Sequence, residues 1–223
     1  MMSRSPRDTQ LVQSTYLAFM AIVAGWIAAW IVKVRILDPA LPWFTSPAGA
    51  FAFWMTAKLT LWVGPALWLI RVSGRSLREV VNGSRWKHAL LWGGSAGFAI
   101  ALTALVPKYL DDRPLIHFTW SMPMINVLLQ APILEEFLLR GAVFGNLCRH
   151  HSLALANVAS SLLFVALHLP GWYFMDTLAH NSSKPLGGAL SIFLLGLVFG
   201  YVTHRARSFL AGSVEHLINN LFA

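Results

Sequence analysis

The sequence predicts an all-α membrane protein, a polytopic transmembrane helix bundle of about seven spans. Hydrophobic residues occupy 57% of the 223 positions, charged residues only 12%, and the mean hydropathy is +0.60. Soluble domains are considerably less apolar than this. The apolar residues also gather in long stretches, separated by short segments that contain proline, glycine and charge. A protein with this pattern is expected to cross a bilayer several times.

The first apolar stretch, residues 11–32, is long enough to cross about 30 Å of hydrocarbon at about 1.5 Å per residue. It exceeds the apolar region of a typical signal peptide and lacks a small-residue cleavage site, so we interpret it as a membrane span. Six further spans are predicted, at residues 49–70, 89–106, 124–148, 153–168, 186–201 and 209–223. Helix-breaking residues such as Pro107, Pro170 and Gly171 are assigned to the connecting loops. Nothing divides the chain, so we expect one domain over residues 1–223.

The basic residues predict the orientation in the membrane. With alternating spans, ten Lys and Arg residues fall on the N-terminal side and five on the opposite side. Half of those ten lie in one short segment between the second and third spans: Arg71, Arg75, Arg78, Arg85 and Lys87. This asymmetry is typical of the positive-inside rule and indicates contact with lipid headgroups rather than with nucleic acid. We therefore expect an integral protein of the cell (inner) membrane, with the bilayer as a partner, no nucleic-acid partner and a cytoplasmic N-terminus.

Two pairs of glycines in the predicted spans have the spacing that lets helix backbones approach closely. They are Gly93 with Gly97, and Gly196 with Gly200. We assign both pairs to packing within one bundle rather than to dimerisation. The sequence defines no oligomeric state.

Three charged residues, Glu135, Glu136 and Arg140, interrupt the apolar span 124–148. A charge at membrane depth costs roughly 2.5–3.5 kcal/mol on insertion scales, so such residues indicate a functional site by default. At about 100° per residue, Arg140 lies on nearly the same helix face as Glu136 and one turn away. Glu135 is rotated by about 140° from Arg140. We therefore expect Arg140 to neutralise Glu136, and we expect Glu135, whose charge is less compensated, to serve in proton transfer.

Two other spans carry a histidine with a second residue one helical turn away. Phe164 and His168 lie four residues apart in the fifth span, and His216 and Asn220 do so in the last. Polar groups that faced lipid would remain without partners. We therefore expect these side chains and the acidic pair to converge inside the bundle.

These residues resemble the motifs of the CPBP or ABI family of intramembrane endopeptidases, which includes the CAAX prenyl endopeptidases. The family motifs are Glu-Glu-x-x-x-Arg, Phe-x-x-x-His and His-x-x-x-Asn, and the chain carries them in this order at Glu135–Arg140, Phe164–His168 and His216–Asn220. The resemblance extends over about residues 122–223, which we take as the catalytic core.

The resemblance implies a role for each motif residue. Glu135 would be the general base that activates water, with His168 helping to hold or deprotonate it. His216 and Asn220 would stabilise the oxyanion, while Glu136 and Arg140 would form a supporting pair. The reaction would be hydrolysis of a peptide bond in a membrane-associated protein or peptide, without a cofactor.

Two alternatives use the same residues. Glu135, His168 and His216 form a two-histidine, one-carboxylate set, which is the stoichiometry of several catalytic zinc sites, although the chain has no His-Glu-x-x-His helix. We favour the metal-free mechanism over a zinc-dependent protease. The second alternative is a non-catalytic immunity or transport protein. A transport path would require polar residues along several spans, yet Lys58 is the lone charge inside the first three, so we favour the enzyme.

Overall fold

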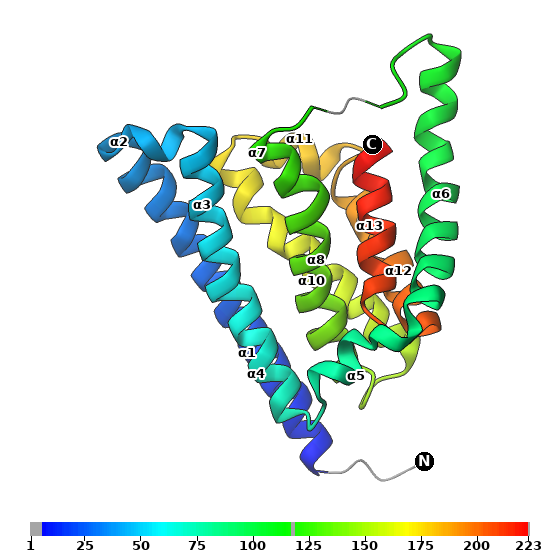
Figure 1. Ribbon diagram of the computed structural model, residues 1–223. Coiled ribbons are helices and arrows are strands. Elements are labelled where there is room, and N and C mark those ends of the chain that lie inside the picture. The colour runs from blue at the N-terminus through cyan, green and yellow to red at the C-terminus, as the bar shows by residue number, and fades with distance from the viewer. Residues whose placement is uncertain (1–5, 117–118, 223) are drawn as a thin grey trace.

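The computed structural model describes residues 6–116 and 119–222, which form helices and turns without a β-strand (Figure 1). Successive helical passes run in alternating directions, so that α1 begins at one end of the bundle and α13 ends at the other (Figure 1). This confirms the predicted all-α helix bundle. The first two passes lie together at one edge, α6 lies at the opposite edge, and the remaining passes fill the space between them (Figure 1).

The first three passes contain the following helices: α1 (Pro6–Ile31), the π-helix η1 (Val32–Leu37) and α2 (Asp38–Ala40); the 3-10 helix η2 (Pro42–Thr45), α3 (Pro47–Lys58), the π-helix η3 (Leu59–Val63) and α4 (Gly64–Val72); and α5 (Leu77–Val81), the 3-10 helix η4 (Gly83–Arg85) and α6 (Trp86–Leu110). The other four contain α7 (Met122–Ile125), the π-helix η5 (Asn126–Gln130), α8 (Ala131–Glu136), the π-helix η6 (Phe137–Phe144) and α9 (Gly145–Leu147); α10 (Leu153–Phe174) and α11 (Leu178–Ser183); α12 (Ala189–Ala206); and α13 (Leu210–Phe222).

Five of the described helical segments are long and apolar enough to cross a membrane: Asp8–Ala40, Pro47–Val72, Leu77–Leu110, Leu153–Phe174 and Ala189–Ala206. The pass from Met122 to Leu147 is of similar length but carries three buried charges. Helix α13 has only 13 residues, which corresponds to about 20 Å. The predicted last span is therefore a helix, but it is too short to cross the hydrocarbon core by itself.

The prediction that Pro107 and Pro170 lie in loops is wrong. Pro107 lies inside α6 and Pro170 inside α10, and both helices continue for about one further turn. Proline removes one backbone donor, but membrane helices tolerate this loss where neighbouring groups satisfy the freed carbonyl. A proline by itself therefore does not mark the end of a span in this protein.

Tryptophan side chains join the first two passes. Trp26 of α1 lies 4.7 Å from Trp62 and 5.1 Å from Trp54 between ring centroids, and Trp30 lies 4.3 Å from Trp54. Rings of this size bury a large apolar area and pack in tilted and edge-on geometries. The cluster thus holds α1 against α3 and η3 at one edge of the bundle.

Asn146 and Arg75 connect this edge to the rest of the bundle. Asn146 is fully buried at the end of the Met122–Leu147 pass, and its Nδ2 donates to Thr15 Oγ1 at 3.2 Å and to the Leu69 carbonyl at 3.3 Å. Arg75, in the turn after α4, donates to the Gly141 and Ala142 carbonyls and to Asn146 Oδ1. Burial, together with the neighbouring Arg149, lowers the pKa of the Arg75 guanidinium to about 10, so it remains charged at neutral pH.

Glycine allows α13 to pack closely against α6. A Cβ atom on Gly93 would lie 2.2 Å from the Ala211 carbonyl oxygen, and one on Gly97 would lie 2.9 Å from Ile218 Cβ. The second glycine pair behaves alike, since a Cβ on Gly200 would lie 1.9 Å from Asn157 Oδ1. These contacts confirm that both glycine pairs pack helices within one bundle.

We predict that Gly93→Ala lowers the thermal stability of the purified protein, because the new methyl group meets a backbone oxygen that cannot move without displacing α13. Gly94→Ala is the matched control: its Cβ would have no atom within 4 Å, and alanine favours the helix. The measurement is the midpoint of thermal unfolding in detergent. Equal midpoints for the two variants would contradict the close packing of α6 and α13.

Candidate active site

Glu135 and His168 line the same cavity, although they come from different helices. The cavity has a volume of about 160 Å³, and Lys58 is its third charged or titratable lining residue. The remaining lining residues are apolar or aromatic: Trp26, Trp30, Trp62, Leu167, Gly171, Trp172 and Met175. A few convergent polar groups in mostly apolar surroundings are typical of a ligand or active site.

Glu135 and Glu136 lie at the junction of α8 with the long π-helix η6. Irregular turns of this kind occur often at functional sites. Successive residues of a helix point in different directions, and here Glu135 lines the cavity while Glu136 is completely buried. One helix thus presents two neighbouring carboxylates to two different environments.

A backbone hydrogen bond fixes the tautomer of His168. Its Nδ1 lies 2.9 Å from the Phe164 carbonyl oxygen one turn earlier. A carbonyl can only accept, so Nδ1 carries the hydrogen and Nε2 is free to accept a proton or a hydrogen bond in the neutral ring. The Phe-x-x-x-His spacing therefore positions a base on the helix.

Glu136 contacts the side chains of two motifs. The Arg140 Nε atom lies 3.4 Å from Glu136 Oε2, so the expected pair between these residues is present, and both side chains are fully enclosed. The His216 Nδ1 atom lies 3.3 Å from Glu136 Oε1. The first and third motifs therefore meet at this carboxylate.

Arg140 links further helices to the same cluster. Its Nη2 donates to the Gly196 carbonyl of α12 at 3.0 Å. The guanidinium lies 5.1 Å from the ring centroid of Phe164 and 5.6 Å from that of Phe199. The Phe164 ring also contacts both histidines, with centroid distances of 4.9 Å to His168 and 6.0 Å to His216. The structure thus brings all three motifs together around one buried arginine.

Glu135 has a cationic partner of its own, which comes from a different span. Lys58 Nζ lies 3.6 Å from Glu135 Oε1, and the two side chains are 8% and 10% exposed. The sequence contained a signal for this contact, because a single lysine inside an apolar span needs a partner in the bundle interior. It could not identify the partner, which lies 77 positions away in the chain.

Glu215 is a second residue that the sequence analysis missed. It is fully buried on α13, and neither carboxylate oxygen has a hydrogen-bond partner among the described residues. It interacts electrostatically with Glu136 and Arg140. The cluster around Arg140 therefore holds one guanidinium and two carboxylates, next to His216.

Asn220 is not among the residues that line the cavity. Its Nδ2 donates to the Val127 carbonyl of η5 at 2.9 Å. In a π-helix that carbonyl would accept from the residue five positions later, which is Pro132 and has no N–H. The amide of Asn220 therefore satisfies an acceptor that proline leaves free, and it holds α13 against η5.

The proposed zinc ligands do not form one set. Glu135 and His168 share the cavity, whereas His216 is paired with Glu136. Within residues 6–116 and 119–222, no group of three His, Cys, Asp or Glu side chains is arranged to hold a metal ion. Lys58 also places a positive charge beside the carboxylate that would bind the metal.

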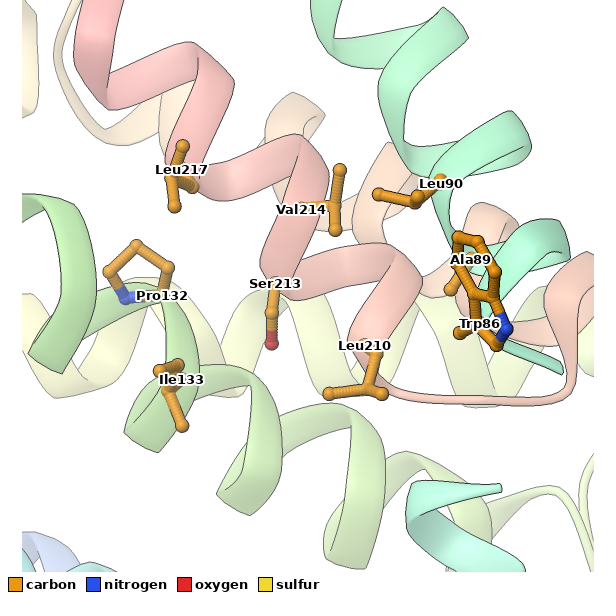
Figure 2. A pocket seen from close by; sticks show the side chains of 9 residues that line it. All are labelled: Trp86, Ala89, Leu90, Pro132, Ile133, Leu210, Ser213, Val214 and Leu217. Carbon is orange, nitrogen blue, oxygen red and sulfur yellow. The ribbon is translucent and has the colours of Figure 1, made fainter. Parts of the chain in front are cut away.

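A second cleft, with a volume of about 310 Å³, lies between α6, α8 and α13 (Figure 2). Its lining is almost entirely apolar, and Ser213 is the polar side chain that projects into it from α13 (Figure 2). None of the motif residues lines this cleft. Its surface offers no acid, base or charged donor for catalysis.

The part of the chain that carries the three motifs matches a known protein family. Residues 117–222, just under half of the chain, match the family described as type II CAAX prenyl endopeptidase Rce1-like. No curated protein and no solved structure matches the chain. The matched region contains all three motifs, while Lys58 and the tryptophan cluster of the first two passes lie outside it.

We predict that Glu136→Gln destabilises the fold, because it leaves the buried Arg140 without its carboxylate partner. Breaking comparable buried pairs costs about 3–5 kcal/mol of folding free energy. Glu135→Gln is the matched control and should be less harmful, since its partner Lys58 lines a cavity and is not completely enclosed. Abundance in the membrane and the thermal unfolding midpoint measure the difference. If both variants behave alike, Glu136 does not have this structural role.

Proposed function

Through residues 117–222 the chain belongs to the Rce1-like family of type II CAAX prenyl endopeptidases and is a membrane protease, and on this premise we propose that it hydrolyses a peptide bond with water activated by Glu135. The substrate is a membrane-associated protein or peptide. The observation that carries the proposal is the cavity that Glu135 and His168 both line, among mostly apolar side chains. A general base in such a site is shielded from bulk water, where competing hydrogen bonds would weaken it.

The proposed reaction begins with a water molecule in this cavity. Glu135 accepts a proton from the water, whose oxygen attacks the carbonyl carbon of the peptide as the carbonyl π electrons move to the oxygen. His168 orients the water through Nε2, the nitrogen left free by the Phe164 bond. The proton then passes from Glu135 to the leaving nitrogen, and the C–N bond breaks as the oxyanion re-forms a carbonyl, which releases an amine and a carboxylic acid.

The oxyanion needs donors, and we propose His216 and Asn220 because they match the His-x-x-x-Asn motif, although neither lines the cavity in the absence of substrate. We propose that the His216 ring acts in its doubly protonated form, in which Nδ1 donates to Glu136 and Nε2 donates to the oxyanion. Asn220 donates to the Val127 carbonyl in the absence of substrate. An oxyanion is a stronger acceptor than a neutral carbonyl, so we propose that the amide exchanges this partner when the oxyanion forms. Glu136 and Arg140 act by holding the helices in place.

We propose that the reaction needs no metal ion. The support is the donor set: His216 is engaged with Glu136, and Lys58 supplies the charge next to Glu135. A water molecule in this site is activated by a carboxylate base, and the oxyanion is stabilised by hydrogen-bond donors.

We predict that Glu135→Gln abolishes cleavage, because the amide keeps the shape of the side chain but cannot accept the proton from water. The measurement is a comparison of peptide termini by mass spectrometry in cells that express either the parental protein or the variant. Termini that appear only with the parental protein identify the substrates. An unchanged set of termini would exclude Glu135 as the base.

A second measurement addresses the metal with the purified parental protein and a prenylated peptide that ends in a CAAX sequence. Exhaustive chelation should leave the rate of product formation unchanged. Loss of activity that zinc restores would instead establish the zinc-dependent mechanism.

We also propose that the N-terminus is cytoplasmic and that the protein resides in the cell (inner) membrane. The support is the excess of basic residues at the end of the bundle where α1 begins and where α5 lies (Figure 1). With this orientation, the turn near Ser84 faces the cytoplasm and α11 faces the opposite compartment.

We predict the corresponding labelling pattern for single cysteines at Ser84 and Ser182, both of which are exposed. Cys148, the single cysteine of the chain, is first replaced by serine. In intact cells an impermeant maleimide should label position 182 and not position 84, and both should react after lysis. Labelling at 84 alone would invert the orientation.

A further inference from the structure

Lys58 lies near the middle of a membrane span, yet its charged group is directed into the protein. It is the last residue of α3, within the segment Pro47–Val72, and is 7% exposed. Lysines near the ends of membrane helices usually extend their ammonium toward the interface. Here Nζ instead lies 3.6 Å from Glu135 Oε1 and 5.0 Å from the centroid of the Trp62 ring.

The two motif glutamates are paired with cationic side chains from different parts of the chain. Arg140 comes from the same helix as Glu136, and that pair is sealed from solvent. Lys58 comes from the half of the chain that precedes the family match, and its pair with Glu135 forms part of the cavity wall. The first pair is closed to a substrate, whereas the second lies in the wall of the cavity that we propose binds it.

The contact with Lys58 involves one oxygen of the carboxylate. Because Nζ lies near Oε1, the other oxygen remains available to a water molecule in the cavity. Trp62 is itself buried and packed against Trp26. The Lys58 ammonium therefore packs over an aromatic ring that is held in place by the tryptophan cluster. A charged base that is fixed in one orientation loses less freedom when the reaction begins.

We propose that Lys58 is a positioning residue of this protease: it compensates the charge of Glu135 and orients the carboxylate toward the water in the cavity. The proposal rests on the proposed role of Glu135 as the base. It implies that the first two passes complete the active site and do more than anchor the matched region. Catalysis then requires residues from both halves of the chain.

The test uses Lys58→Met, which keeps the length of the side chain and removes its charge. The matched control is Lys33→Met, because Lys33 is also a buried lysine in a membrane helix but is paired with Asp38, five positions later in the chain. With a prenylated CAAX peptide as the probe, we expect Lys58→Met to lower kcat at least tenfold with KM within threefold of the parental value. Lys33→Met should retain the parental kcat. A kcat for Lys58→Met within twofold of the parental value would overturn the proposal.

Thermal unfolding tests the pair without a substrate. Lys58→Met should lower the unfolding midpoint of the parental protein but not that of Glu135→Gln, in which there is no carboxylate to compensate. Equal lowering in both backgrounds would show that Lys58 supports the fold independently of Glu135 and would overturn the proposal. If Lys58→Met does not accumulate, accumulation of the double variant Lys58→Met/Glu135→Gln supports the proposal, and its absence overturns it.

The two measurements separate this proposal from the proposed function. If Glu135→Gln still cleaves the peptide, Glu135 is not the base and the proposed function fails, along with the catalytic role of Lys58. If the parental protein does not cleave this peptide, the choice of substrate is wrong, and the unfolding midpoints alone decide whether Lys58 and Glu135 act as a pair.

Discussion

The ion pair between Glu136 and Arg140 constrains the arrangement of the C-terminal half of the chain. A guanidinium stays charged in a protein interior, so burying it requires a carboxylate and further acceptors nearby. Arg140 obtains these from Glu136 on its own helix and from the Gly196 carbonyl on α12. Glu136 in turn binds His216 on α13. Because these buried side chains contact groups on several helices, the helices cannot shift independently.

The contacts among Glu136, Arg140 and the neighbouring helices depend on small residues where these helices cross. A Cβ atom on Gly212 would lie 2.8 Å from Glu136 Oε2, and one on Gly196 would lie 3.2 Å from Arg140 Nη2. Larger side chains would separate α12 and α13 from the ion pair and leave its charges unsatisfied. Apolar helices have no hydrophobic driving force to associate within lipid, so close backbone approach and buried polar contacts must supply the specificity.

The neighbouring carboxylates Glu135 and Glu136 have different roles, one chemical and one structural. Glu136 has two partners and no access to solvent, so it is suited to hold helices together. Glu135 has one charged partner and lines a cavity with His168. Their different environments follow from the helix geometry, because adjacent residues on a helix point toward different neighbours. The helix from Met122 to Leu147 therefore supplies both a structural pair and the proposed base.

The amino-acid sequence by itself determined the all-α membrane class, the three motifs and the pairing of Glu136 with Arg140. These features are local: hydrophobic runs define the spans, and an i, i+4 spacing within one helix defines the pair. The ends of α6 and α10 were less predictable, because neighbouring helices decide whether a proline is tolerated. Only the tertiary structure decided that Lys58 compensates Glu135, that His216 binds Glu136, and that Asn220 satisfies the carbonyl left free by Pro132. Each of these contacts joins residues far apart in the chain, and helical periodicity describes one helix at a time without stating which faces of different helices meet.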